Sequence, residues 1–145
     1  MGFSTMRKSA YDIAFRLIGE TEIKGAQHNT KIVQMLKIYG YSADEVAWCS
    51  AFVAYCVQES GYSIENTTAS ARSWLNWGKS TTNPKKGDIV VFQRPPSPTS
   101  GHVAFFDSIT PNGSIRVIGG NQGSKGSVTF SNFPKSLLLG YRTYE

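Results

Sequence analysis

The stretch that decides the fold is AWCSAFVAYC, residues 47–56. Small and apolar residues continue to Glu59 without a Gly or a Pro, and Gly61 follows. This pattern predicts a buried helix that begins near Cys49 and is closed by Gly61. The backbone N–H groups at the start of a helix have no intrahelical partner, so they stabilise a thiolate placed there. We therefore interpret Cys49 as a candidate nucleophile.

The start of this helix has a second possible position. Ser42 and Glu45 have the spacing of a capping box, so a turn of helix can also begin before Cys49. Stabilisation of the thiolate is weaker if Cys49 lies inside the helix, because the effect of the helix dipole falls off after the first turn. The sequence leaves both positions open.

The two cysteines are not expected to form a disulfide. On one helix, Cys49 and Cys56 are separated by a rise of roughly 10.5 Å, whereas a disulfide needs Cα atoms within about 7 Å. We expect Cys49 to be a free thiol. We interpret Cys56 as an inert core residue, which is also the commoner role for a lone cysteine on an apolar helix.

The composition is that of a globular protein. The 145 residues are 40% hydrophobic and 17% charged, with a net charge of +5, which predicts one domain spanning residues 1–145. A positive charge suits nucleic acid, membranes or bacterial cell wall. The basic residues form no stripe along the sequence, so we do not expect nucleic-acid binding.

The N-terminal region does not have the pattern of a signal peptide. Residues 1–7 are followed by Lys8, Asp12 and Arg16 in place of an apolar segment. No run approaches the ~18 apolar residues of a membrane span. We expect a protein made in the cytoplasm that does not insert stably into membranes, and that needs another factor to act outside.

Helical patterns come first along the chain and strand patterns second. Helices are predicted at about 9–18, 30–39, 49–59 and 71–78, and strands at about 87–92, 102–107, 115–118, 128–130 and 137–142. Pro111-Asn112-Gly113-Ser114 predicts a hairpin turn, which makes the neighbouring strands antiparallel. The expected fold class is therefore α+β, with N-terminal helices packed on a small antiparallel sheet.

A thiolate nucleophile needs a base, and the base needs a partner that fixes its tautomer. Of the two histidines, His28 lies in a polar loop, whereas His102 begins an apolar strand that would hold its ring. Asn121 follows the strand that returns beside His102. The sequence therefore predicts a site of Cys49, His102 and Asn121, in the chain order of papain-like proteases. We expect the Cys49 N–H to be one oxyanion donor.

Other residues have plainer interpretations. Taken alone, Asn121 in a Gly-rich segment is usually a turn residue. Trp74 and Trp77 could flank a substrate groove, but at least one is expected in the core. Asp88 is expected to cap a turn. Gly119–Gly123 is not interpreted as a phosphate-binding loop, because it follows a hairpin strand and precedes no helical pattern.

Five motifs in this order resemble the CHAP-type cysteine amidohydrolase/peptidase domains, papain-like peptidoglycan hydrolases found in phage endolysins and bacterial wall enzymes. They are WCSAFV at 48–53, ARSWLNWG at 71–78, GDIVVF at 87–92, GHVAF at 101–105 and GGNQ at 119–122, with an additional likeness at 22–25 and 28–29. The resemblance implies a papain-like fold with Cys49 as nucleophile, His102 as base and Asn121 as third member.

The chain departs from the family pattern in three places. Some members carry a Glu where this chain has Gly119, and some have an acidic calcium-binding loop that is not visible here. We also expect no separate wall-binding domain after the catalytic one. We therefore expect no required metal or other cofactor, and wall affinity that comes from the domain itself.

The resemblance implies hydrolysis of an amide bond in peptidoglycan, either muramoyl–L-alanine or a bond of the stem peptide, through an acyl-enzyme on Cys49. We expect a monomeric phage endolysin that reaches the cell wall or periplasm through a holin lesion. The alternatives are a wall-degrading toxin delivered by a secretion system with an immunity partner, acyl transfer to an acceptor other than water, and a wall-binding module without turnover.

Overall fold

A computed structural model describes residues 2–21, 30–40, 48–123 and 126–144. The helices lie mainly in the first half of the chain: α1 (Phe3–Arg16), α2 (Thr30–Leu36), α3 (Cys49–Glu59) and the 3-10 helices η1 (Lys37–Tyr39), η2 (Ala71–Asn76) and η3 (Lys135–Leu137). The strands follow: β1 (Lys79–Thr81), β2 (Ile89–Arg94), β3 (Ser97–Ile109), β4 (Ile115–Gln122), β5 (Ser127–Phe133) and β6 (Leu138–Thr143).

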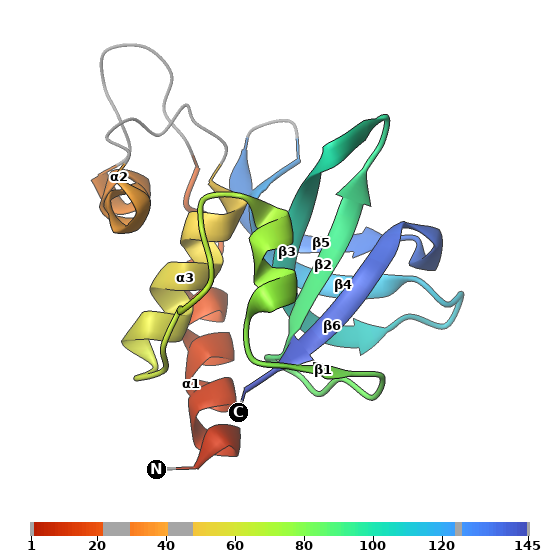
Figure 1. Ribbon diagram of the computed structural model, residues 1–145, viewed down its shortest axis with the longest axis horizontal. Coiled ribbons are helices and arrows are strands. Elements are labelled where there is room, and N and C mark those ends of the chain that lie inside the picture. The colour runs from red at the N-terminus through yellow and green to blue at the C-terminus, as the bar shows by residue number, and fades with distance from the viewer. Residues whose placement is uncertain (1, 22–29, 41–47, 124–125, 145) are drawn as a thin grey trace.

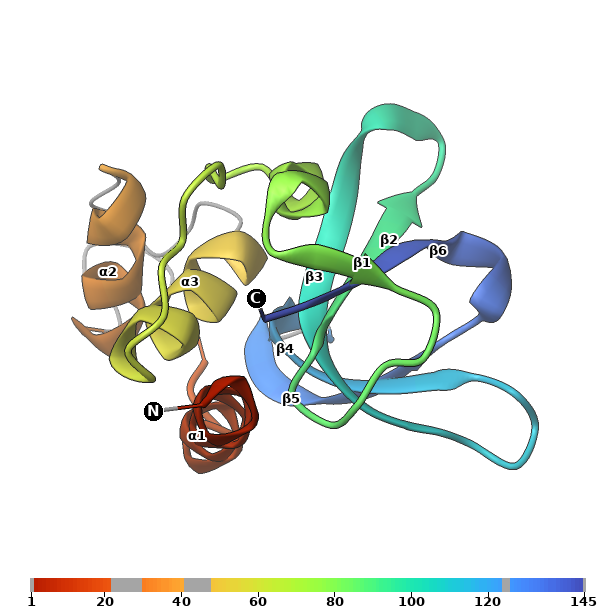
Figure 2. The same cartoon turned by 60° about the horizontal axis from the view of Figure 1, so that its bottom comes forward.

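The strands form one antiparallel sheet in the order β1-β6-β2-β3-β4-β5. Helices α1, α2 and α3 gather on one side of this sheet (Figure 1), and the turned view keeps the same two layers (Figure 2). The predicted α+β class, with N-terminal helices packed on an antiparallel sheet, is confirmed. Within the described part of the chain, no helix has both the length and the apolar character needed to span a bilayer.

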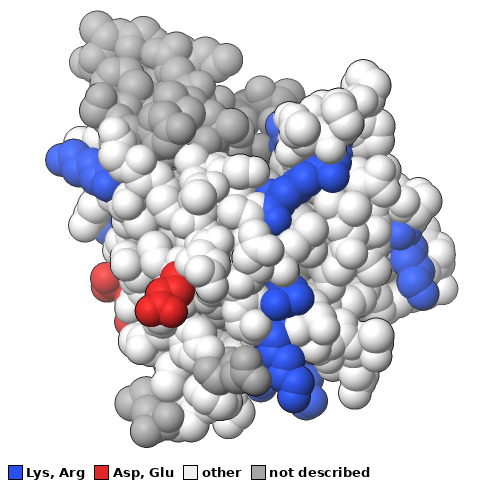
Figure 3. Space-filling model, viewed as in Figure 1, with Lys and Arg blue, Asp and Glu red and all other residues white. Residues whose placement is uncertain are grey.

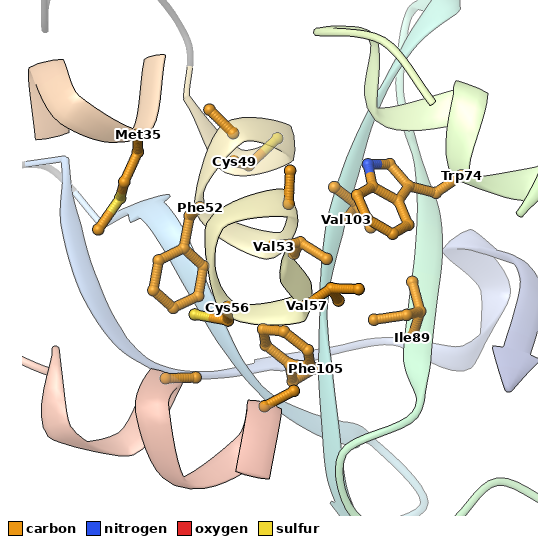
Figure 4. Close-up of a cluster of buried hydrophobic side chains, with 14 of the residues drawn as sticks. Met35, Cys49, Phe52, Val53, Cys56, Val57, Trp74, Ile89, Val103 and Phe105 are labelled. Atoms are coloured by element: carbon orange, nitrogen blue, oxygen red, sulfur yellow. The ribbon is translucent and has the colours of Figure 1, made fainter. Parts of the chain in front are cut away.

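The main core lies between α3 and the sheet. Eight residues of α3 are buried, and Phe52 meets Phe105 of β3 edge-on with ring centroids 6.0 Å apart. Figure 4 shows these side chains together with Val57, Ile89 and Trp74. A second apolar cluster covers the opposite face of the sheet and includes Phe92 and Phe106. Strands buried on both faces need apolar residues throughout, which explains the continuous run Ile89-Val90-Val91-Phe92.

Several boundaries differ from the sequence-based expectation. Helix α1 begins at Phe3, six residues before its predicted start, and the short exposed strand β1 was expected to be loop. Strands β3 and β4 include residues 97–101 and 119–122, which were also expected to be loops. Gly and Pro weaken a strand pattern, whereas pairing with neighbouring strands holds these segments extended. The possible earlier helix start at Ser42 and Glu45 lies outside the described residues.

Close packing explains the two glycines that begin the 119–122 segment. A Cβ on Gly120 would lie 2.6 Å from the Trp48 ring and 2.7 Å from Cβ of Phe52. A Cβ on Gly119 would lie 2.8 Å from Cδ of Gln122. Glycine is needed because backbone and side chain approach closely. Gly120 thus lets the first turn of α3 pack on β4, and Gly119 leaves room for the Gln122 amide.

Asp88 joins both ends of the chain. Its buried carboxylate accepts hydrogen bonds from Arg7 of α1 at 2.8 Å and from the Thr143 hydroxyl of β6 at 2.6 Å. It also accepts the Lys85 backbone N–H at 2.8 Å, which is the turn-capping role expected from the sequence. Because a buried carboxylate is costly unless it is paired, these three donors make Asp88 a fixed junction between helices and sheet.

Candidate active site

Cys49 is the first residue of α3, directly after the N-cap residue Trp48. Its side chain is 6% exposed, and Figure 4 shows its sulfur on the side of the helix that faces β3. The next residue, Ser50, donates to the Thr68 carbonyl at 2.6 Å and accepts from the Trp74 indole at 2.8 Å. These two bonds fix the first turn of α3, and with it the position of the thiol.

Several groups act on the ionisation of Cys49. Burial raises the pKa of the thiol, but the charge of His102, hydrogen bonding by His102, the Val103 backbone N–H and the charge of Arg94 outweigh burial, and the pKa is lowered. Cys56 lacks such donors, and burial beside Glu59 raises its pKa well above the ordinary value. Both cysteines are free, as predicted, but their environments favour the thiolate only at position 49.

His102 is held on β3 by packing against two aromatic rings. Its ring stacks on Phe92, with centroids 6.5 Å apart, and tilts against Phe133 at 5.2 Å. On the chain before it, Arg72 of η2 donates to the Ser100 carbonyl at 2.7 Å. A Cβ on Gly101 would lie 2.6 Å from the Phe92 carbonyl oxygen, so only glycine fits before the histidine. The strand thus fixes the ring, as the sequence predicted.

The partner of the imidazole is Gln122. His102 Nε2 lies 2.7 Å from Gln122 Oε1. The Gln122 amide nitrogen donates to the Thr129 carbonyl at 2.7 Å, with a longer contact to the Thr129 hydroxyl at 3.3 Å. A carbonyl can only accept, so the amide must turn its oxygen towards His102. Nε2 therefore carries a proton, and Nδ1 is the ring nitrogen that Gln122 does not engage.

Nδ1 is the nitrogen left for the sulfur. It is buried and has no partner in ordinary hydrogen-bonding geometry among the residues that the structure describes, yet the ring is near enough to lower the pKa of Cys49. In ligand-free enzymes such a bond between nucleophile and base is often long, and it tightens when substrate binds. The Cys49 thiol, the His102 imidazole and the Gln122 amide are therefore neighbours in this order, and Nδ1 is the ring nitrogen on the side of the thiol.

Asn121, the third member expected from the sequence, lies beside this arrangement. It borders the same cavity as His102, but the hydrogen bond on the imidazole comes from the next residue, Gln122. From the pair Gly119↔Thr129 to the pair Gln122↔Ser127, β4 advances by three positions and β5 by two. Strand β4 therefore has a bulge. Asn121 adopts φ 58° there, a left-handed conformation that asparagine tolerates. The bulge turns Gln122 to the side of the histidine.

A cavity of about 400 Å³ opens next to His102. Besides His102, Asn121 and Gln122, it is lined by Arg94 from the end of β2 and by Ser131 and Phe133 of β5. Its volume lies in the usual range for ligand sites. A larger cavity of about 640 Å³ lies at Thr81, Phe106 and Tyr141, but it contains none of the groups just described. We therefore place the candidate substrate cleft at the smaller cavity.

The remaining sequence-based expectations have plain outcomes. Trp74 and Trp77 are both buried, at 0% and 2% exposure, which favours the core interpretation for both. His28 lies outside the described residues. In residues 2–21, 30–40, 48–123 and 126–144, no three His, Cys, Asp or Glu side chains are grouped closely enough to hold a metal ion.

A model of the CHAP domain matches residues 41–121, more than half of the chain. The chain belongs to the CHAP domain family. CHAP domains are cysteine- and histidine-dependent amidohydrolases and peptidases, so the thiol and imidazole lie in the type of fold that uses them. A comparison with curated proteins found no match. The CHAP match ends at Asn121, one residue before the side chain that bonds to His102.

The two thiols of this CHAP domain should differ in their reaction with iodoacetamide. We expect Cys49 to be alkylated with an apparent pKa below that of free cysteine in the same buffer, because His102 and Arg94 favour its thiolate. Cys56 should stay unmodified in the folded protein, since it is fully buried and its pKa is raised. Peptide mapping by mass spectrometry across pH 5–10 measures both. An apparent pKa for Cys49 at or above the free value would contradict the electrostatic argument.

Proposed function

We propose that this CHAP domain hydrolyses an amide bond of peptidoglycan through an acyl-enzyme on Cys49. The observation that carries the proposal is that Cys49 at the start of α3, His102 on β3 and Gln122 on β4 are neighbours in this order. The imidazole of His102 has a proton on Nε2, towards Gln122, which leaves Nδ1 for the thiol. This is what a nucleophile, its general base and the orienter of the base require.

In the acylation step, Nδ1 of His102 takes the thiol proton and the sulfur attacks the amide carbon. The carbonyl oxygen becomes an oxyanion beside the Cys49 backbone N–H, which has no intrahelical partner at the first position of α3. The imidazolium then gives its proton to the amide nitrogen. The C–N bond breaks, the amine leaves, and the acyl group remains on sulfur as a thioester.

In the deacylation step, water replaces the amine. His102 takes a proton from the water, the hydroxyl adds to the thioester, and the C–S bond breaks to release a carboxylic acid. The proton returns to the thiolate. Gln122 holds the ring throughout, because its amide is itself fixed on the Thr129 carbonyl.

The choice of peptidoglycan rests on family and charge. CHAP membership supports an amidase or peptidase of the peptidoglycan-hydrolase type. The net charge of +5 favours adhesion to an anionic wall. On the face shown in Figure 3, basic side chains occur over both layers, whereas the acidic ones lie only over the helical side.

A digest of purified sacculi tests the proposal. The wild type should release fragments with one new amine and one new carboxyl group for each bond cut. Mass spectrometry then separates the two target bonds, since cleavage at muramoyl–L-alanine frees intact stem peptides and an endopeptidase cuts within them. A protein that binds sacculi without releasing fragments would support the wall-binding module in place of the enzyme.

We further propose the role of a phage endolysin, which the positive charge suits. The competing role is a toxin delivered by a secretion system. Co-purification with a small protein that inhibits the digest would favour the toxin. Lysis of cells whose membrane has been permeabilised, without such an inhibitor, supports the endolysin.

Exchange of the two neighbouring amides tests which one orients the base. Gln122→Ala should lower kcat by roughly 10- to 100-fold, since the loss of a hydrogen bond to a group that becomes charged costs about 1.5–3 kcal/mol. Asn121→Gly keeps the left-handed backbone and the bond on the imidazole, so kcat should stay within about threefold. A contact of Asn121 with substrate in the cavity would appear in KM. Steady-state kinetics on a soluble fragment give kcat and KM separately.

The reverse ranking of these two variants would restore Asn121 as the third member of the site. Equal and small effects would mean that the stacking on Phe92 and Phe133 holds the ring without either amide. Circular dichroism of both variants is the control for folding.

A further inference from the structure

Arg94 ends β2 at the rim of the cavity beside His102. A shift of register between Gln93 and Arg94 ends the regular pairing with β3 there. The residue is exposed, and its side chain makes no hydrogen bond or ion pair with any described residue. A nearby arginine, Arg72 of η2, by contrast donates to the Ser100 carbonyl. Arg94 is therefore a free guanidinium beside the proposed base.

The rest of the cavity wall is suited to an anion. Among its described lining residues there is no Asp or Glu, while Asn121 and Ser131 supply an amide and a hydroxyl that can donate. Phe133 gives an apolar wall. A guanidinium presents its donors as a planar fork that fits a carboxylate, and charge-assisted bonds of this kind are the strong ones.

We propose that this cavity is a subsite for a carboxylate of the substrate, held by Arg94 next to the bond that Cys49 attacks. The inference rests on the proposed function and narrows its substrate class. The preferred substrates are wall peptides that keep a free carboxylate near the scissile bond, and fragments with that group converted to a carboxamide are poor substrates. Arg94 then determines substrate specificity, because it contacts the substrate carboxylate and takes no part in proton transfer.

Arg94 has a second effect that the test must separate. Its charge also lowers the pKa of Cys49, so its removal slows every substrate at neutral pH. That effect is the same for a carboxylate and for a carboxamide substrate. The subsite, by contrast, favours the carboxylate substrate over the carboxamide substrate. The ratio of the kcat/KM values of these two substrates therefore measures the subsite alone.

The experiment uses one soluble peptide fragment that the wild type cleaves and its analogue with the nearest carboxylate amidated. We expect the wild type to prefer the carboxylate form by roughly 10- to 100-fold in kcat/KM, the range of a charge-assisted hydrogen bond. In Arg94→Gln this ratio should fall to near one. Arg94→Lys should give an intermediate ratio, because it keeps the charge and loses the fork.

Lys79→Gln is the matched control for net charge. It removes one exposed positive charge from β1, at the edge of the sheet farthest from β5. Its ratio should equal that of the wild type. The fragments contain no phosphate, so a subsite that in fact serves phosphate groups of wall polymers would show no preference and would overturn the carboxylate assignment.

The outcomes separate this inference from the proposed function. If the wild type cleaves both fragments with equal kcat/KM, the carboxylate subsite is excluded and the proposed hydrolase function is retained. A preference that persists in Arg94→Gln also overturns the role of Arg94. If the wild type cleaves neither fragment nor sacculi, the proposed function fails, and the subsite fails with it.

Discussion

Replacement of Cys49 by serine is expected to reduce cleavage of sacculi by roughly 10,000-fold or more, the scale on which a covalent nucleophile is lost. The pKa of a hydroxyl is far higher than that of a thiol, so the contacts that favour the thiolate cannot ionise it. Serine is close in size to cysteine, so α3 should keep its packing. Release of free amino groups from sacculi measures the rate.

Cys56→Ala is the matched control for this variant. It removes the second thiol of the same helix, which is fully buried in the core two turns after Cys49. Its activity should stay within about threefold of the wild type, with some loss of thermal stability from the smaller side chain. If Cys49→Ser digested sacculi at a rate similar to the wild type, an acyl-enzyme on Cys49 would be excluded.

His102→Ala is expected to have the second largest effect. Loss of general acid–base catalysis should lower kcat by about 100- to 10,000-fold. The variant also loses the charge and the hydrogen bond of His102, two of the contributions that oppose the effect of burial on the thiol, so the pKa of Cys49 rises. A raised thiol pKa leaves less thiolate at neutral pH, so the remaining activity should increase further with pH than that of the wild type. Profiles of kcat/KM between pH 5 and 10 measure this change.

Added imidazole gives a sharper form of this test. Removal of the ring leaves a space beside the stacked pair Phe92 and Phe133, and free imidazole in the buffer should restore part of the rate. Iodoacetamide labelling of Cys49 in the same variant should shift to higher pH. An unchanged labelling profile would show that the imidazole has no influence on the sulfur.

The helical part of the site follows from local sequence patterns. The run around Cys49 contains no Gly or Pro and is closed by Gly61, so position, length and burial of α3 could all be predicted. His102 was predicted for a similar reason, because it begins the apolar, buried part of β3. The hairpin at Asn112-Gly113 correctly implied that β4 returns beside β3.

The identity of the amide beside His102 could not be predicted in this way. Regular alternation along β4 would place Gln122 on the face opposite to Gly119. The bulge instead brings Gln122 to the same face as Gly119. The bulge depends on the pairing of β4 with β5, and no local pattern in residues 119–122 indicates that pairing. The glycines that suggested a loop instead permit close contacts within a strand. The sequence does contain one signal for Gln122 as the partner of His102. Gln122 directly follows Asn121, a residue type that tolerates the left-handed conformation found at bulges, and its side-chain amide is longer than that of asparagine.

The junction at Asp88 has a practical consequence for engineering. It joins α1 to β6, and the start of α1 and the end of β6 both lie at the end of the molecule opposite to the start of α3 (Figure 1). A targeting module fused after β6 would therefore point away from the cleft and leave its entrance open.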